Sequence, residues 1–270
     1  MENKNNINNT ILKKKHNREN DKNLPLILET DNNKEKNNNT ENNNTIPNKN
    51  LYPSIKKKLI VILNQSTLEL SNSKNPQILN CDDDIKILKK QKKNPDLFRP
   101  DITHQCLLNL FDSPLNKVGL LKVYIKTKKN IFIDINNQTR IPRTFKRFIG
   151  LFSQLLKNGN IKNEKNENLL NIINFDNNYF KNFPKILIDN KKGRLIDIEN
   201  YCKKIDKNLK INNNIVFIIN ADVNDLNLNN NYKEKDIQID DIISLSSYNI
   251  TSNVECAKLC STFENIWDVL

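Results

Sequence analysis

The chain has few of the residues on which common catalytic and cofactor-binding motifs depend. It contains four glycines and two histidines among 270 residues. No GxGxxG, Walker, HExxH or GxSxG pattern occurs, which argues against the corresponding dinucleotide, nucleotide, zinc-protease and serine-hydrolase sites. His16 falls in the N-terminal tract, and we expect His104, early in a helix, to be structural or a polar contact rather than a catalytic base. No carboxylate cluster has the pattern of a metal site.

Cysteine pairs and long apolar runs are also missing. The five cysteines are odd in number and include no CxxC pair, which indicates a reducing compartment and neither a disulfide framework nor a zinc site. We expect Cys256 and Cys260 to pack as small apolar groups on a helix. Without an 18-residue apolar run or a charged-then-apolar leader, we expect a soluble intracellular protein with no membrane segment.

What is abundant at the N-terminus is asparagine, with 18 among the first 50 residues. Such a tract cannot bury enough apolar surface to offset its ordering entropy. We therefore expect residues 1–56 to form a disordered low-complexity tail and residues 57–270 to form one α/β domain. The lysines of the tail could aid nuclear retention, or the tail could be a low-complexity expansion without a function.

Positive charge gathers in the middle of the chain. The net charge of +12 favours polyanionic partners, although lysine enrichment by compositional drift explains the tail as well. Four of the six arginines lie between Arg99 and Phe148, the arginine segment, and residues 99–150 carry ten basic and three acidic side chains. The planar guanidinium matches phosphate geometry. The segment is therefore predicted to contact nucleic acid, with an exposed, solvated basic face as the alternative.

Apolar patterning predicts strands alternating with helices, and hence a mainly parallel sheet. Residues 158–168 are expected to be a surface insertion and residues 224–236 a loop. The expected strands are 59–63, 121–125, 131–135, 185–188, 215–219 and 242–246, and the expected helices are 82–90, one from near Asp101 to Asp112, one from Pro142, 196–205 and 254–270. In the last helix, the expected apolar positions are Val254, Ala257, Phe263, Ile266, Trp267 and Leu270.

Two helix starts carry candidate functional residues. Asp101 follows Pro100, so its carboxylate is expected to cap the helix by accepting a backbone N–H. Pro142 is expected to begin the next helix. Arg143 and Arg147 would then share a face, with Arg140 just before the helix, at an N-terminus that favours anions.

Several long motifs in one order resemble the EMG/NEP family of ribosome-biogenesis factors. They are Arg99-Pro-Asp-Ile-Thr-His-Gln105, Asp112-Ser-Pro-Leu-Asn-Lys117 with Gly119-Leu-Leu121, and Gln138-Thr-Arg-Ile-Pro-Arg-Thr-Phe-Lys-Arg-Phe148, supported by Leu79 to Asp82, Ile215 to Ile219 and Cys256 to Lys258 with Phe263 and Trp267. The resemblance extends from about residue 57 to the C-terminus. It implies a small-subunit ribosomal RNA pseudouridine-N1-methyltransferase of the SPOUT superfamily.

The family resemblance implies a trefoil-knotted α/β domain that acts as a nuclear or nucleolar homodimer on small-subunit ribosomal RNA within the pre-ribosomal particle. It implies that Arg99, Arg140, Arg143 and Arg147 bind an RNA hairpin. S-adenosylmethionine is expected in the loops that include Ile188, Asn220, Asp225, Leu245, Ser246, Ser247, Tyr248, Asn249 and Ile250. For the reaction, we expect Asp101 to accept or orient the N1 proton of the pseudouridine, a role that it could combine with helix capping.

The cofactor loops differ from the family pattern. The family's Gly-Ala-x-Ala-x-Gly becomes residues 220–225 of this chain, in which both glycines are lost and Asp222 and Asp225 appear. Its Ser-Asn-Tyr-Pro-Leu becomes residues 246–250, without the proline. Asn220 could replace glycine because asparagine tolerates positive φ. Two hypotheses follow: an active methyltransferase, or a non-catalytic RNA-binding assembly factor of the same family. A monomeric RNA binder is a third reading.

Overall fold

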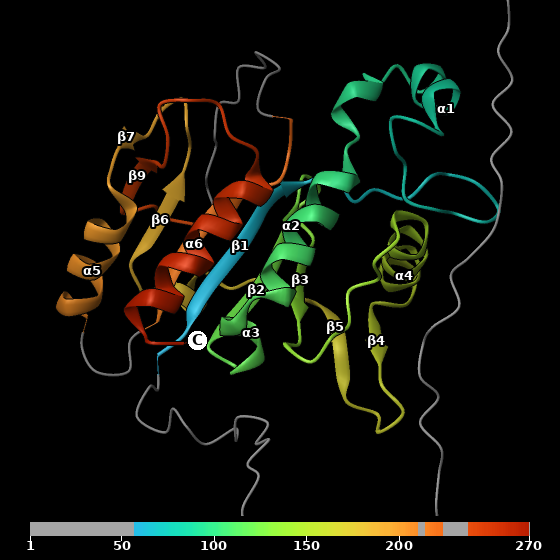
Figure 1. The fold of residues 1–270 in the computed structure, drawn as a ribbon. Helices are drawn as coiled ribbons and strands as arrows, with labels where there is room; N and C mark the ends of the chain where they lie inside the picture. The colour runs from blue at the N-terminus through green and yellow to red at the C-terminus, as the bar shows by residue number, and fades with distance from the viewer. Residues whose placement is uncertain (1–56, 210–213, 224–236, 270) are drawn as a thin grey trace, which may run out of the picture. The chain divides into compact units, whose positions relative to one another are not determined.

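The structure, a computed structural model, describes residues 57–209, 214–223 and 237–269. Within these residues the strands form one sheet in the order β4-β5-β3-β2-β1-β8-β6-β9-β7 (Figure 1). The expected tail at 1–56 and the expected loop at 224–236 lie outside the described residues. No helix in the described part of the chain is long and apolar enough to cross a membrane.

The parallel part of the sheet is centred on β1 (Leu59–Ser66), which pairs with β2 (Leu121–Thr127) and β8 (Ile215–Asn220). Strands β6 (Lys185–Ile188) and β9 (Asp241–Ser244) continue it. Buried side chains cover both faces of β1, which explains its continuous apolar run. The sequence prediction of a buried strand behind three lysines is confirmed.

At one edge the sheet turns antiparallel, through β3 (Phe132–Ile135), β5 (Asn168–Ile173) and β4 (Asn160–Lys162). The expected surface insertion at 158–168 is therefore wrong in part, because β4 and the first residue of β5 fall inside it. An edge hairpin needs no strong apolar alternation, and its polar side chains protect the open edge. At the opposite edge, β7 (Arg194–Leu195) pairs with β9.

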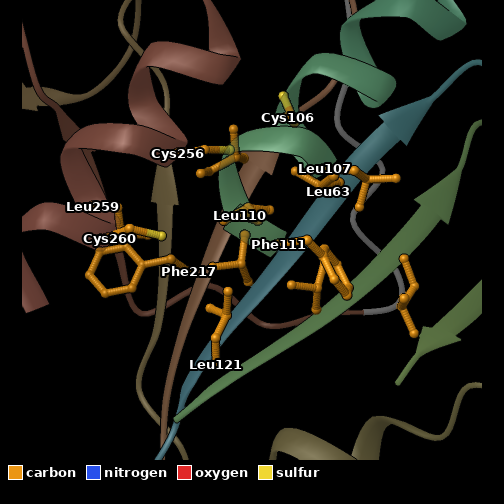
Figure 2. Close-up of a cluster of buried hydrophobic side chains, with 14 of the residues drawn as sticks. Leu63, Cys106, Leu107, Leu110, Phe111, Leu121, Phe217, Cys256, Leu259 and Cys260 are labelled. Atoms are coloured by element: carbon orange, nitrogen blue, oxygen red, sulfur yellow. The ribbon is translucent and has the colours of Figure 1, made fainter. Parts of the chain in front are cut away.

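Helices α2 (Pro100–Asp112), α5 (Ile198–Asn208) and α6 (Ser252–Ile266) contribute to the larger hydrophobic core. Figure 2 shows the inner side chains of α2 and α6 meeting those of β1, β2 and β8. Cys256 and Cys260 lie among them and are buried, as predicted. Each large apolar side chain buried here contributes about 1.5–3 kcal/mol relative to exposure.

Some helices begin later in the chain than predicted. α1 (Ile85–Lys90) begins after Asp82 and Asp83, because the side chain of Asn80 accepts their backbone N–H groups in a turn. α4 (Phe145–Asn158) begins after Pro142.

In α6 the expected apolar positions Val254 and Ala257 are exposed, whereas Phe263 and Trp267 are buried as expected, and Leu259 also faces the core. Leu270 lies outside the described residues. The short α3 (Pro114–Lys117) follows α2 directly, since Ser113 ends one helix and caps the next.

Candidate functional site

The candidate site lies at the edge where the central parallel strands end. β1 ends at Ser66, β6 at Ile188, β8 at Asn220 and β9 at Ser244. Ligands of open α/β sheets bind outside the carboxyl ends of such strands. The loops that follow these strands contain most of the residues that the sequence assigned to a cofactor.

The start of α2 is fixed to the end of β1 by buried hydroxyl groups. The hydroxyls of Ser66 and Thr103 are 2.6 Å apart, and Thr67 Oγ1 accepts the backbone N–H of Arg99 at 3.0 Å. Because both contacts join residues far apart in the sequence, they place Arg99 and Asp101 at the same sheet edge as the loops.

Arg99 and Asp101 form a bidentate ion pair. Arg99 donates from Nε to Oδ1 at 2.8 Å and from Nη2 to Oδ2 at 2.6 Å. These hydrogen bonds raise the pKa of Arg99 above its ordinary value. The capping prediction is wrong: Arg99 is the N-cap residue, Pro100 follows it, and Asp101 is the second residue of the helix. Its carboxylate is oriented by Arg99 instead.

Arg140 and Arg143 line a cavity of about 860 Å³ together with Asn116, Lys117 and Asp112. Arg143 forms a bidentate pair with Asp112, in which its Nη2 lies 2.9 Å from Oδ1. The cavity brings two of the four predicted RNA-binding arginines together with the Asp112–Lys117 motif.

Arg147 lies in the first turn of α4 and is exposed, as is Arg140. Pro142 does not begin the helix, because Thr144 is the N-cap residue. His104 Nε2 lies 2.7 Å from the carbonyl oxygen of Pro142, and its ring stacks on Phe148. The prediction that His104 is structural or a polar contact is confirmed, since it anchors the segment before α4.

The loop after β8 begins with buried residues. Asn220 Oδ1 accepts from Asn64 Nδ2 at 3.0 Å, and the N–H of Ala221 donates to the Asn64 carbonyl at 2.7 Å. The described residues other than glycine with positive φ are Gln65, Lys92, Asn130, Asn166 and Asp268. Asn220 therefore replaces glycine without a left-handed backbone, contrary to the sequence argument.

Asp222, one of the two acids that depart from the family pattern, is buried at the same edge. Lys128, from the turn between β2 and β3, places its Nζ 3.6 Å from Asp222 Oδ2. Burial raises the pKa of Asp222, and Lys128 opposes that shift. The added charge is thus partly balanced within the fold. Asp225 lies outside the described residues.

The side chains of the loop after β9 range from buried to exposed. Leu245 is buried, Ser246 and Ile250 are half-buried, and Ser247, Tyr248 and Asn249 are exposed. Ile188 is buried at the end of the neighbouring β6. Apolar side chains beside turns with hydroxyl and backbone groups suit a ligand with an aromatic ring and a polar chain. These residues therefore fit an adenosyl cofactor.

Five residues connect these loops and form what we call the loop junction, and sequence reasoning missed all of them except Asn220. In the folded chain they are linked by hydrogen bonds between loops far apart in the sequence. A glutamate in the first turn of a helix ordinarily indicates a solvent-facing position, so no local signal identified the others. The loop junction consists of Asn190, Asn220, Ser244, Ser252 and Glu255.

No group of three or more potential metal ligands occurs among residues 57–209, 214–223 and 237–269. The arrangement is that of an α/β protein with a candidate binding site at the carboxyl edge of its parallel strands, where Arg99 also lies. Open α/β sheets hold small ligands at this edge, and arginine side chains bind polyanions.

The chain belongs to the EMG1/NEP1 methyltransferase family, whose sequence profile matches residues 61–264. It is 37% identical over 226 residues to the ribosomal RNA small subunit methyltransferase NEP1 of Drosophila melanogaster, covering 80% of this chain and 84% of the relative. It is 38% identical over 216 residues to the protein of the same name from Homo sapiens, covering 79% and 84%. The family resemblance noted in the sequence is confirmed.

The fold is also similar to a crystal structure of Archaeoglobus fulgidus Nep1 bound to S-adenosylhomocysteine. The TM-score is 0.57 at 20% identity, covering 77% of this chain and 98% of that one. The predicted fold class, mixed α/β with a mainly parallel sheet, is confirmed.

Proposed function

We propose that this protein transfers a methyl group from S-adenosylmethionine to N1 of a pseudouridine in small-subunit ribosomal RNA. The observation that carries the proposal is the gathering of the loops after β6, β8 and β9 beside the Arg99–Asp101 pair, in a chain of the EMG1/NEP1 methyltransferase family. Curated relatives that it matches over most of their length are named ribosomal RNA small subunit methyltransferases.

Each predicted site residue has a role in this proposal. The cofactor lies against the loop residues Ile188, Asn220 and 245–250, with Asp225 in the same loop as Asn220. When bound, it supplies an electrophilic methyl group on a sulfonium. Arg99, Arg140, Arg143 and Arg147 hold phosphates of an RNA hairpin, because guanidinium groups bind phosphate in a fixed geometry.

Asp101 accepts or orients the proton of N1, which the nitrogen must lose as the methyl group arrives. Its two oxygens are fixed by Arg99, so its orientation toward the substrate is set before binding. Replacement by asparagine keeps the shape of the side chain and removes the basic oxygen. We expect Asp101→Asn to lower turnover about 100-fold or more with unchanged hairpin affinity. Unchanged turnover removes Asp101 from the chemistry.

The proposed setting is that of the family: a homodimer with a trefoil knot, at work on the pre-ribosomal small subunit in the nucleus and nucleolus. Residues 57–270 form the catalytic domain in this proposal, and residues 1–56 precede it as a low-complexity tail. Sedimentation of the purified chain tests the dimer, and imaging of a tagged chain tests the location.

Calorimetric titration with S-adenosylmethionine and S-adenosylhomocysteine is the first test of the function. We expect affinity near the micromolar range, about −8 kcal/mol, followed by methyl transfer to a pseudouridine-bearing hairpin. A hairpin with uridine at the same position is the matched substrate control. Hairpin binding without cofactor binding, even when RNA is present, would instead support the non-catalytic assembly factor.

A further inference from the structure

The first turn of α6 directs two polar side chains into the protein. α6 follows directly on the loop after β9, yet Ser252 and Glu255 are each only 2% exposed. Burying a hydroxyl or carboxyl group costs free energy unless it is hydrogen-bonded. The hydrogen-bond partners of these two side chains therefore show which parts of the chain the first turn of α6 holds in place.

Ser252 connects α6 to the loop after β8. Its Oγ donates to the carbonyl oxygen of Asn220 at 2.6 Å, and both groups are buried. The side chain of Asn220 is bound in turn by Asn64 of β1. The beginning of this loop is thus held both from the helix and from the central strand.

Glu255 connects α6 to the loops after β6 and β9. Its Oε1 accepts from Asn190 Nδ2 at 2.7 Å. Asn190 Oδ1 lies 3.1 Å from Ser244 Oγ, and the same hydroxyl lies 2.8 Å from the carbonyl oxygen of Ser246. One amide therefore joins the helix, the end of β9 and the turn that follows it.

We propose that Ser252 and Glu255 are positioning residues that hold three cofactor loops in one arrangement, acting through Asn190 and the backbone of Asn220. The inference rests on the proposed cofactor site at these loops. The loops after three separate strands are not joined to one another directly along the chain, and rigid loops bind a ligand with a smaller loss of entropy. The loop junction supplies that support.

The ionisation of Glu255 gives this role a signature. Burial raises its pKa to about 8, Asn190 opposes the shift, and the negative charge of Asp189 adds to it. The carboxyl group is therefore protonated at neutral pH, and above about pH 8 a negative charge appears inside the loop junction. Asp222, on the loop after β8, also lies close enough to Asp189 for their two charges to interact.

Thiol groups also lie beside the first turn of α6. Cys106 of α2 contacts Cys256 of α6, and burial raises the pKa of Cys256 well above its ordinary value, so it stays neutral. α3 meets α6 at Glu264, and α5 meets it at Trp267, both toward the other end of the helix. Glu264 is thus a glutamate on the same helix without a bond to the loops.

The experiment measures the affinity of the purified full-length protein for S-adenosylhomocysteine by calorimetry at pH 7. We expect Glu255→Ala to weaken binding about 10- to 100-fold, because Asn190 loses its buried partner. Glu255→Gln, which resembles the protonated acid, should retain the affinity. Glu264→Ala is the control on the same helix and should leave it unchanged. Hairpin affinity should stay constant in all variants.

A pH series separates positioning from general structural support. Affinity of the unsubstituted protein should fall above pH 8, when Glu255 ionises, whereas Glu255→Gln should show no such fall. If Glu255→Ala does not fold, Asn190→Ala removes the same hydrogen bond from the loop side and should weaken binding similarly.

The outcomes are distinguishable. No cofactor binding by the unsubstituted protein overturns the proposed function and this inference together. Normal binding that is equal in Glu255→Ala, or in Asn190→Ala, overturns this inference alone. A loss of affinity in Glu264→Ala as large as in Glu255→Ala also overturns it, because the effect would then reflect the helix rather than its first turn.

Discussion

The arginine segment and the loop junction differ in how their polar groups meet water. Arg140, Arg143 and Arg147 are exposed, and Arg143 pairs with a carboxylate that is itself exposed. Glu255 and Ser252 are buried, and they form hydrogen bonds with Asn190 and with the carbonyl group of Asn220. Exposed charges contribute little to stability and remain free to exchange water for phosphate. Buried polar groups depend on their partners.

Among the tests of this comparison, the largest effect on the free energy of unfolding is expected from the ionisation of Glu255. Its pKa is raised from 4.5 to about 8, so between these pH values the folded state binds the proton more tightly than the unfolded state. The free energy of unfolding should therefore fall as pH rises through this window, by at most about 1.4 kcal/mol per pH unit. Above it, the contribution is constant.

Urea unfolding at a series of pH values measures this slope. Glu255→Gln should flatten the curve between pH 5 and pH 8, while Glu264→Gln should change it less because that side chain is less buried. Identical curves for the unsubstituted protein and Glu255→Gln would show that the carboxyl group titrates normally.

The next largest effect is expected at Gly193, in the turn after β6. A Cβ at this position would lie 2.2 Å from the carbonyl carbon of Ile243 in β9. Because backbone cannot move aside like a flexible side chain, Gly193→Ala should destabilise the protein by about 3 kcal/mol.

Gly150 is the matched control, since a Cβ there meets nothing within 4 Å. It lies inside α4, where alanine is the better helix former, so Gly150→Ala should stabilise by about 0.5–1 kcal/mol. Denaturant midpoints compare the two variants. A small destabilisation by Gly193→Ala would mean that the turn after β6 can move away from β9 more easily than its packing indicates.

A smaller effect is expected where a lysine meets a buried acid. Lys128→Met leaves Asp222, whose side chain is 8% exposed, without its cation, and should cost about 1 kcal/mol. Asp222→Asn combined with Lys128→Met should recover most of that loss. Unfolding free energies of the two single variants and the double variant test this, and additive effects would argue against the pair.

The smallest effect on stability is expected in the arginine segment. Asp112→Ala breaks the exposed pair with Arg143 and should leave the unfolding midpoint unchanged. Arg143→Ala should also leave it unchanged, but should weaken hairpin binding and lower the salt dependence of the affinity by about one unit of slope. Filter binding at several salt concentrations measures both. A destabilised Arg143→Ala would remove the contrast with the loop junction.

Local patterns were enough to predict the elements whose burial is uniform. The apolar run at Leu59–Leu63 predicted β1, and Pro114 predicted the end of α2. Predictions failed where a local rule competed with a contact from elsewhere. The carboxylate of Asp101 has Arg99 as its partner instead of a helix N–H, and the polar hairpin β4–β5 is stabilised as a sheet edge.

The sequence by itself determined the mixed α/β class, the family and the concentration of arginine, since each depends on residue type and order along the chain. Only the tertiary structure decided which groups meet at the carboxyl ends of the parallel strands. The bonds from Asn190 to Glu255 and from Ser252 to Asn220 span 65 and 32 residues. Burial decides the properties of these groups, and burial is fixed only when the whole sheet has formed.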